Sequence, residues 1–251
     1  MLEKHGNRCR TYFAADFDAQ VGSQFADLAN EIRRKYEPDK VQLGPHNYLF
    51  SWPSKRVLLV MNPWRMALQT LGLAAWKKKL SDHETMIRFS LDRLGIHKLK
   101  RIGFKVTAEI PLSMSHAEMC DLMFGSFVVP KERLEKVCGN PVDPLVHIEG
   151  ENGDMQYILV VSSLTPEQVT KDLRTTPNLD LFLEDKYLDK GVREFLERIR
   201  QEDCFHYDID LFRRDMDASN VKDFVQSSME KAEQIAEACV RNLKSLPIEA
   251  K

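Results

Sequence analysis

Apolar and polar side chains alternate along residues 101–112 (RIGFKVTAEIPL). Apolar side chains occupy the even positions from Ile102 to Ile110, and polar or small ones the odd positions from Arg101 to Glu109. Successive side chains of a strand point to opposite faces, so the pattern predicts a strand with one buried and one solvated face. Parallel sheets are usually buried on both faces, and the pattern therefore favours an antiparallel sheet.

Other segments extend this sheet. Residues 41–43, 48–52, 56–61 and 65–73 are β-rich and separated by turn residues, which predicts an antiparallel meander. Asn152-Gly153 between two apolar runs predicts a hairpin. Strands are also expected at residues 10–18 and 204–211, and helices at 21–36 and 192–200. We predict an α+β fold, in which a large, mostly antiparallel sheet is covered on its apolar face by helices and the chain ends in a long helix.

Two segments carry the capping-box pattern, in which a hydroxyl side chain and a carboxylate three residues later satisfy free amide groups. Ser81 and Glu84 predict one helix start, and Ser115 and Glu118 another. His83 and His116 fall inside these boxes, where we interpret them as structural. No pair of histidines has the spacing of a known metal motif.

The size and composition are those of a folded protein. With 251 residues the chain is expected to form a single α+β domain over 1–251, with a subdivision near the proline-containing segment 127–144 as the alternative. Five dispersed cysteines without a CxxC pair indicate reduced, buried thiols. No apolar run approaches the length of a membrane span, and no signal peptide is recognised, so we expect a cytoplasmic protein that does not bind membranes.

The residues His206, Asp208 and Asp210 alternate along the predicted strand near the C-terminus. Side chains two apart on a strand share a face, so two carboxylates and an imidazole would project together. Such a group is able to hold Mg²⁺ or Mn²⁺ in a phosphodiesterase or nuclease. The alternative is a solvated strand face whose acids are paired with nearby basic side chains.

Two basic groups flank one predicted helix. The residues of this candidate nucleic-acid patch are Trp76, Lys77, Lys78, Lys79, Lys98, Lys100 and Arg101. An exposed indole beside lysines is able to stack on bases. The net charge of −2 argues against nucleic acid, and a solvated basic face is the alternative. Trp52 and Trp64 are expected in the core.

The final helix is predicted over residues 219–243 and carries a narrow apolar seam at alternating three- and four-residue spacing. Its side chains are Val221, Val225, Ser228, Ala232, Ile235 and Cys239. Either the seam packs on the sheet of its own chain, or it forms a helix–helix contact in a homodimer.

The sequence contains no GxGxxG, GxxxxGK[ST] or GxSxG motif. We therefore expect no cofactor, and whether the chain is an enzyme stays open. The first hypothesis is a non-enzymatic protein-interaction or regulatory module that binds a protein partner through a sheet face or the final helix. The alternatives are the metal-dependent phosphodiesterase or nuclease and a weak nucleic-acid binder.

The layout resembles a sporadically distributed family of uncharacterised bacterial proteins of about this length. The resemblance is carried by RTYFAADFD, VQLGPHNYLFSW, the central Arg101-Ile102-Gly103-Phe104 and the Asp208-Ile209-Asp210 strand before a long helix. The family's tyrosine-asparagine pair after the central glycine is replaced by Lys105-Val106-Thr107. The resemblance implies an α+β architecture, a bacterial cytoplasmic setting and a mobile or defence-linked gene neighbourhood, and it implies no activity.

Overall fold

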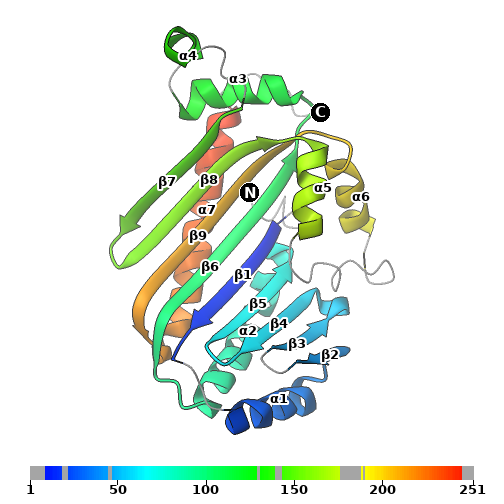
Figure 1. The fold of residues 1–251 in the computed structure, drawn as a ribbon, viewed down its shortest axis with the longest axis vertical. Helices are drawn as coiled ribbons and strands as arrows, with labels where there is room; N and C mark the ends of the chain where they lie inside the picture. Colours follow the sequence, from blue (N-terminus) through cyan, green and yellow to red (C-terminus); the bar gives the residue numbers. More distant parts are fainter. Residues whose placement is uncertain are drawn as a thin grey trace.

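Nine strands form one sheet in the computed structural model, which describes residues 9–18, 22–44, 47–128, 131–138, 143–175, 188 and 190–244 (Figure 1). In chain order the strands are β1 (Cys9–Asp16), β2 (Lys40–Leu43), β3 (Tyr48–Trp52), β4 (Val57–Asn62), β5 (Arg65–Leu71), β6 (Lys98–Pro111), β7 (Leu145–Asn152), β8 (Met155–Leu164) and β9 (Cys204–Asp217). Their order across the sheet is β2-β3-β4-β5-β1-β6-β9-β8-β7, and every neighbouring pair is antiparallel. The predicted antiparallel sheet is confirmed.

The predicted meander and the predicted hairpin are both present, and they form the two outer parts of the sheet. Strands β2 to β5 pair in succession as a meander. At the other side of the sheet Asn152 pairs with Met155, and Gly153 in the turn has φ +64°, a value that glycine adopts without strain. Strand β1 inserts between β5 and β6, which joins the meander to the rest of the sheet.

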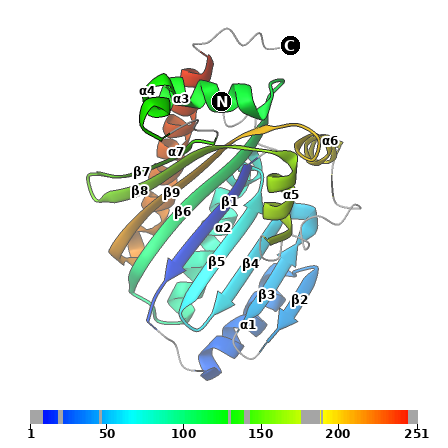
Figure 2. The same cartoon turned by 45° about the horizontal axis from the view of Figure 1, so that its top comes forward.

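The helices are α1 (Gly22–Tyr36), α2 (Leu73–Arg93), α3 (His116–Phe127), α4 (Lys131–Cys138), α5 (Pro166–Thr175), α6 (Lys190–Ile199) and α7 (Val221–Lys244). Figures 1 and 2 show α2 and α7 behind the sheet, on the opposite side from α5. The apolar side chains of α1, α2, α3 and α7 join those of the sheet in one large core. We call the sheet surface under these helices the core face.

The core face is built by the alternation noted in the sequence. Ile102, Phe104 and Val106 of β6 are fully buried, and Phe104 pairs with Phe13 of β1 on one side and Leu211 of β9 on the other. Side chains at these positions interlock across three strands, so they hold the centre of the sheet to the helices.

Helices α5 and α6 differ from the prediction that helices cover the apolar face. Their side chains form a second cluster, with Val192 and Ile199 of α6 packed near Leu58, Leu71 and Cys204. These strand residues point away from the core face, so α5 and α6 cover one end of the other sheet surface. The strand ends are apolar on both faces there, a local exception to the alternation elsewhere.

One of the two predicted capping boxes is confirmed. Ser115 caps α3 by accepting from the Glu118 amide, and the Glu118 carboxylate accepts from the Ser115 amide. The start predicted at Ser81 is wrong, because α2 begins at Leu73. Residues 73–80 are mostly leucine, alanine and lysine, and these strong helix formers extend the helix upstream of the box.

Residues 127–144 do not interrupt the sheet. Strands β1 and β6 precede this segment and β9 and β8 follow it, yet β6 pairs with β9 along their whole length in one ladder. The large core likewise combines residues from both sides of the segment.

The cysteine side chains that the structure describes are buried. Cys120, Cys204 and Cys239 form no disulfide. Burial raises the pKa of Cys204 to about 12 and the pKa of Cys239 to about 11. The side chains of Cys9 and Cys138 lie outside the described residues.

Substitution of Phe104 tests the one-sided core. We expect Phe104→Ala to lower the free energy of unfolding by roughly 3–5 kcal/mol, because it opens a cavity at the centre of the sheet. The neighbouring Lys105→Ala, on the opposite face, should cost at most about 1 kcal/mol. Urea denaturation measures both, and equal losses would contradict the assignment of faces.

Candidate functional site

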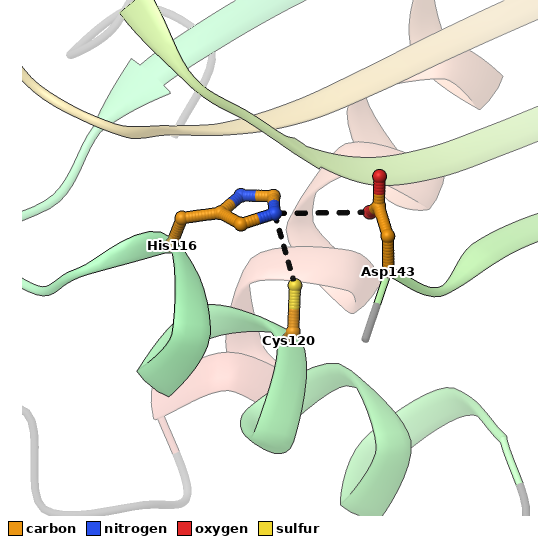
Figure 3. A group of neighbouring side chains, drawn as sticks. All are labelled: His116, Cys120 and Asp143. Atoms are coloured by element: carbon orange, nitrogen blue, oxygen red, sulfur yellow. Dashed lines mark hydrogen bonds and ion pairs between the residues drawn. The ribbon is translucent and has the colours of Figure 1, made fainter. Parts of the chain in front are cut away.

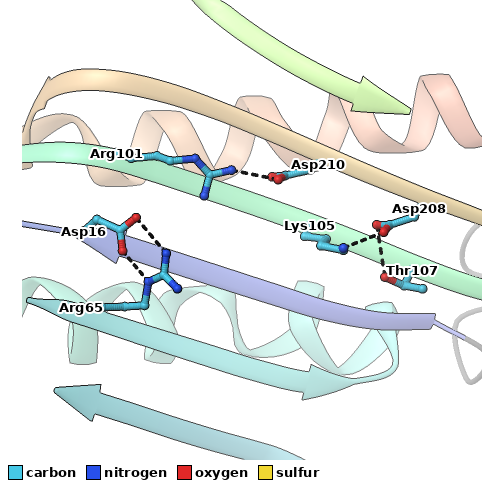
Figure 4. A network of polar contacts seen from close by, with 7 residues as sticks. All are labelled: Asp16, Arg65, Arg101, Lys105, Thr107, Asp208 and Asp210. Atoms are coloured by element: carbon cyan, nitrogen blue, oxygen red, sulfur yellow. Dashed lines mark hydrogen bonds and ion pairs between the residues drawn. The ribbon is translucent and has the colours of Figure 1, made fainter. Parts of the chain in front are cut away.

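The sheet surface opposite the core face carries a network of charged side chains across β5, β1, β6 and β9 (Figure 4). We call this surface the polar face. Its charged and hydrogen-bonding members are Arg10, Asp16, Arg65, Arg101, Lys105, Thr107, Glu109, His206, Asp208 and Asp210. Four acidic and four basic side chains pair with each other, so the charges balance locally.

The predicted metal ligands His206, Asp208 and Asp210 do lie on this one face, as strand periodicity requires. Asp208 accepts from Lys105 Nζ at 2.5 Å and from Thr107 Oγ1 at 3.3 Å. Asp210 accepts from Arg101 at 2.8 Å. These contacts correspond to the ion-paired alternative.

Asp210 is half-buried, and its burial raises its pKa against the opposing effect of the Arg101 and Lys105 charges. The ligand atoms of His206, Asp208 and Asp210 do not all lie within 4.8 Å of one another. Within the described residues, a group of ligand atoms this close occurs elsewhere, beside α3.

Glu109 is the most buried acid of the network, at 3% exposure. Its carboxylate pairs with Arg10, and its Oε1 lies 3.7 Å from His206 Nδ1. Burial acts to raise the pKa of Glu109, but the Arg10 charge and the His206 contact outweigh it and leave the pKa below its ordinary value. The acid is therefore held ionised inside the structure.

Gly103 makes room for Arg101 on the polar face. A Cβ atom at Gly103 would lie 3.2 Å from the Arg101 guanidinium, and that guanidinium stacks 4.6 Å from the centre of the Phe212 ring. Phe212 is the register partner of Gly103. The Arg-Ile-Gly-Phe motif thus places a cation flat on the sheet, between an aromatic ring and Asp210.

The Glu109 ion pair predicts a pH-dependent stability. Glu109→Gln leaves Arg10 with a neutral partner, and we expect a loss of roughly 2–4 kcal/mol near neutral pH. Because the folded pKa is lowered, this contribution is full above the unfolded value of about 4.5 and is lost as pH falls through the folded pKa. Urea denaturation from neutral to acidic pH should show the two proteins converging; a gap that is constant or widens in acid would contradict the ion pair.

The two basic groups lie at opposite ends of α2. The backbone of residues 76–79 is helical near the start of α2, while the side chains of Trp76, Lys77, Lys78 and Lys79 lie outside the described residues. Lys98, Lys100 and Arg101 follow the far end of this 21-residue helix, which spans about 30 Å. Lys100 pairs with Asp18 at 2.6 Å and Arg101 with Asp210, so acids neutralise both.

The seam of α7 is used inside the chain. Val221, Val225, Ser228, Ala232 and Cys239 are buried, and α7 packs on β6 and β9. Ile235, which is partly buried, packs against the same core. This arrangement is the sheet-packing alternative, and a homodimer through these side chains would have to remove them from the core.

Trp52 is buried as predicted, and its Nε1 donates to the Tyr36 carbonyl at 2.8 Å. The core prediction for Trp64 is wrong, because the side chain is 53% exposed. Trp64 lies in the β4–β5 turn, and its backbone carbonyl accepts from the Phe17 amide.

A cavity of 190 Å³ beside Tyr36 and Trp52 is smaller than a typical ligand pocket, which is about 300 Å³ or more.

Strand β7 ends the sheet, and no strand in the described ranges pairs with its outer side. Leu145 is 68% exposed and Ile148 41% exposed, although both are large apolar side chains. Their register partners Ser162 and Leu159 place Leu145 on the polar face and Ile148 on the core face. The strand thus offers free backbone groups together with apolar side chains on both surfaces.

His116, Cys120 and Asp143 come together beside α3 (Figure 3). His116 Nε2 lies 3.5 Å from Cys120 Sγ and 4.0 Å from Asp143 Oδ1. The sequence alone does not predict this group, because His116 falls in a capping box and is interpreted there as structural. A histidine and a cysteine four residues apart at a helix start were the available signal; Asp143 gave none.

Comparison with models of protein families and with curated proteins found no match. The helices in the described part of the chain include none with both the length and the apolar character needed to cross a membrane. The resemblance stated from the sequence stays a prediction.

Proposed function

We propose that this chain is a non-enzymatic protein-interaction module, and that the outer edge of β7 binds the same strand of a second copy. The observation that carries the proposal is the eight-residue edge strand with exposed Leu145 and Ile148. An unpaired edge with exposed apolar side chains favours addition of another strand, and charged side chains on an edge oppose it. Strand β7 also exposes His147, Glu149 and Glu151, so a partner strand has to match these charges as well as cover Leu145 and Ile148.

Charge complementarity selects a second copy as the partner. Consider an antiparallel pair of β7 strands whose twofold axis passes through Ile148. Each residue then faces the residue of the other strand that lies equally far from Ile148 in the opposite direction along the sequence. Ile148 then faces its own copy, and His147 faces Glu149 of the partner subunit. An axis at Glu149 would instead place two glutamates opposite each other, which is unfavourable.

Gly150 supports the same register. A Cβ atom at Gly150 would lie 2.4 Å from the Tyr157 ring, so this ring covers the glycine on the core face. Val146 would face Gly150 of the partner subunit in the Ile148-centred pair. The small residue lets the Tyr157 ring and the incoming strand occupy neighbouring space.

The other surfaces fit a partner less well. The seam of α7 is buried in the chain's own core. The opposite sheet edge, β2, has only four residues. On the polar face the basic side chains are paired with carboxylates, so a polyanion would have to displace them. These facts support the β7 edge and argue against nucleic acid.

Ile148→Asp tests the edge. It places two carboxylates opposite each other at the axis, and we expect the dimer dissociation constant to rise on the order of tenfold or more. Multi-angle light scattering after size exclusion, over a concentration series, measures it. Leu43→Asp, which changes an exposed leucine at the end of β2, is the matched control and should leave the dimer intact.

A charge exchange tests the register. His147→Glu and Glu149→Lys should each weaken the dimer, because each creates a like-charged or less favourable cross-strand pair. The double variant H147E/E149K should recover association, because opposite charges again face each other. A monomeric wild type at micromolar concentration, or a dimer that all these variants leave unchanged, would overturn the proposal.

A further inference from the structure

We propose that His116, Cys120 and Asp143 form a Zn²⁺ site that ties the start of α3 to the segment entering β7. The three ligand atoms come from two places in the chain, and all lie within 4.8 Å of one another. The inference is independent of the proposed dimer.

The helix start aligns two of the ligands. His116 is the first residue of α3, and Cys120 follows one turn later on the same side of the helix. The Ser115–Glu118 capping box fixes that turn, and the His116 amide donates to Asp203 Oδ2 at 2.6 Å. The first turn is thereby held at both the side chains and the backbone.

The distances suit tetrahedral coordination. Zinc bonds of about 2.0–2.3 Å at tetrahedral angles separate neighbouring ligand atoms by roughly 3.3–3.7 Å. The observed separation of His116 Nε2 and Cys120 Sγ is 3.5 Å. The separation of His116 Nε2 and Asp143 Oδ1 is 4.0 Å. A nitrogen and an oxygen ligand of zinc lie roughly 3.4 Å apart, so the exposed carboxylate has to approach by about 0.6 Å.

A second layer of contacts orients the imidazole. Ser163 Oγ of β8 lies 2.8 Å from His116 Nδ1, which leaves Nε2 directed at Cys120 and Asp143. Zinc-bound histidines typically have a hydrogen-bonded partner on the second ring nitrogen, because this partner fixes the tautomer and the ring orientation. Ser163 is itself buried, so its position is fixed by the sheet.

The donor atoms identify the metal class. One nitrogen, one sulfur and one oxygen suit Zn²⁺, whereas Mg²⁺ and Ca²⁺ require oxygen ligands. Cys120 is buried and Asp143 is 47% exposed, so an ion reaches the group from the Asp143 side. Three protein ligands leave a fourth position for water.

Titration of the metal-free full chain with Zn²⁺ tests the site. We expect one ion per chain, and His116→Ala and Cys120→Ala should each weaken binding on the order of 100-fold or more. Ser163→Ala should weaken it roughly 10- to 100-fold, the effect usual for an orienting partner. Asp208→Asn is the matched control, because it alters the His–Asp group on the polar face and should leave affinity unchanged.

Titration with Co²⁺ gives a second measurement. A thiolate-to-cobalt absorption band should appear with the wild type and be absent from Cys120→Ala, while Cys239→Ala should retain it. Asp143→Ala is included because this exposed position carries little risk of unfolding, and circular dichroism checks the fold of every variant. Asp143→Ala, like His116→Ala, should bind Zn²⁺ more weakly than the wild type. Absence of Zn²⁺ binding to the wild type, or wild-type affinity in folded Asp143→Ala and His116→Ala, would overturn the proposal.

Discussion

The opposite character of the two faces of β6 and β9 is the constraint on which the rest of the structure depends. Both strands have 14 residues and pair along their length. Their core-face side chains, such as Phe104 and Leu211, are buried under α7 and the neighbouring helices. A shift of the register by one residue would exchange Phe104 for Lys105 in the core, so burial of one face specifies the pairing.

The polar face shows how a wide sheet tolerates many half-buried charges. Acids and bases from adjacent strands neutralise each other, and the deepest acid, Glu109, is held ionised by Arg10 with His206 nearby. A buried charge without such a partner would cost several kcal/mol. The spacing of Asp208 and Asp210 in the sequence resembles that of metal ligands, but in the structure these two acids form ion pairs with basic side chains of β6.

The proposed metal ligands and the proposed dimer edge both lie at the β7 side of the molecule. Asp143 lies two residues before β7, and Ser163 belongs to β8, the strand paired with β7. A metal at His116, Cys120 and Asp143 would therefore restrain the chain where the proposed edge contact begins. Each proposal rests on separate observations, since the edge depends on exposure and register and the metal group on ligand distances.

The amino-acid sequence by itself determined which segments are strands, the antiparallel class of the sheet and the face that Phe104 and its neighbours occupy, because side-chain periodicity and turn chemistry are local. It also placed His206, Asp208 and Asp210 on one face, since they share a strand. Only the tertiary structure decided their partners, the burial of the α7 seam and the position of α5 and α6. Those outcomes depend on which distant strands become neighbours. The short distance of Asp143 from His116 and Cys120 is likewise decided by the tertiary structure, because the segment that leads into β7 passes beside α3.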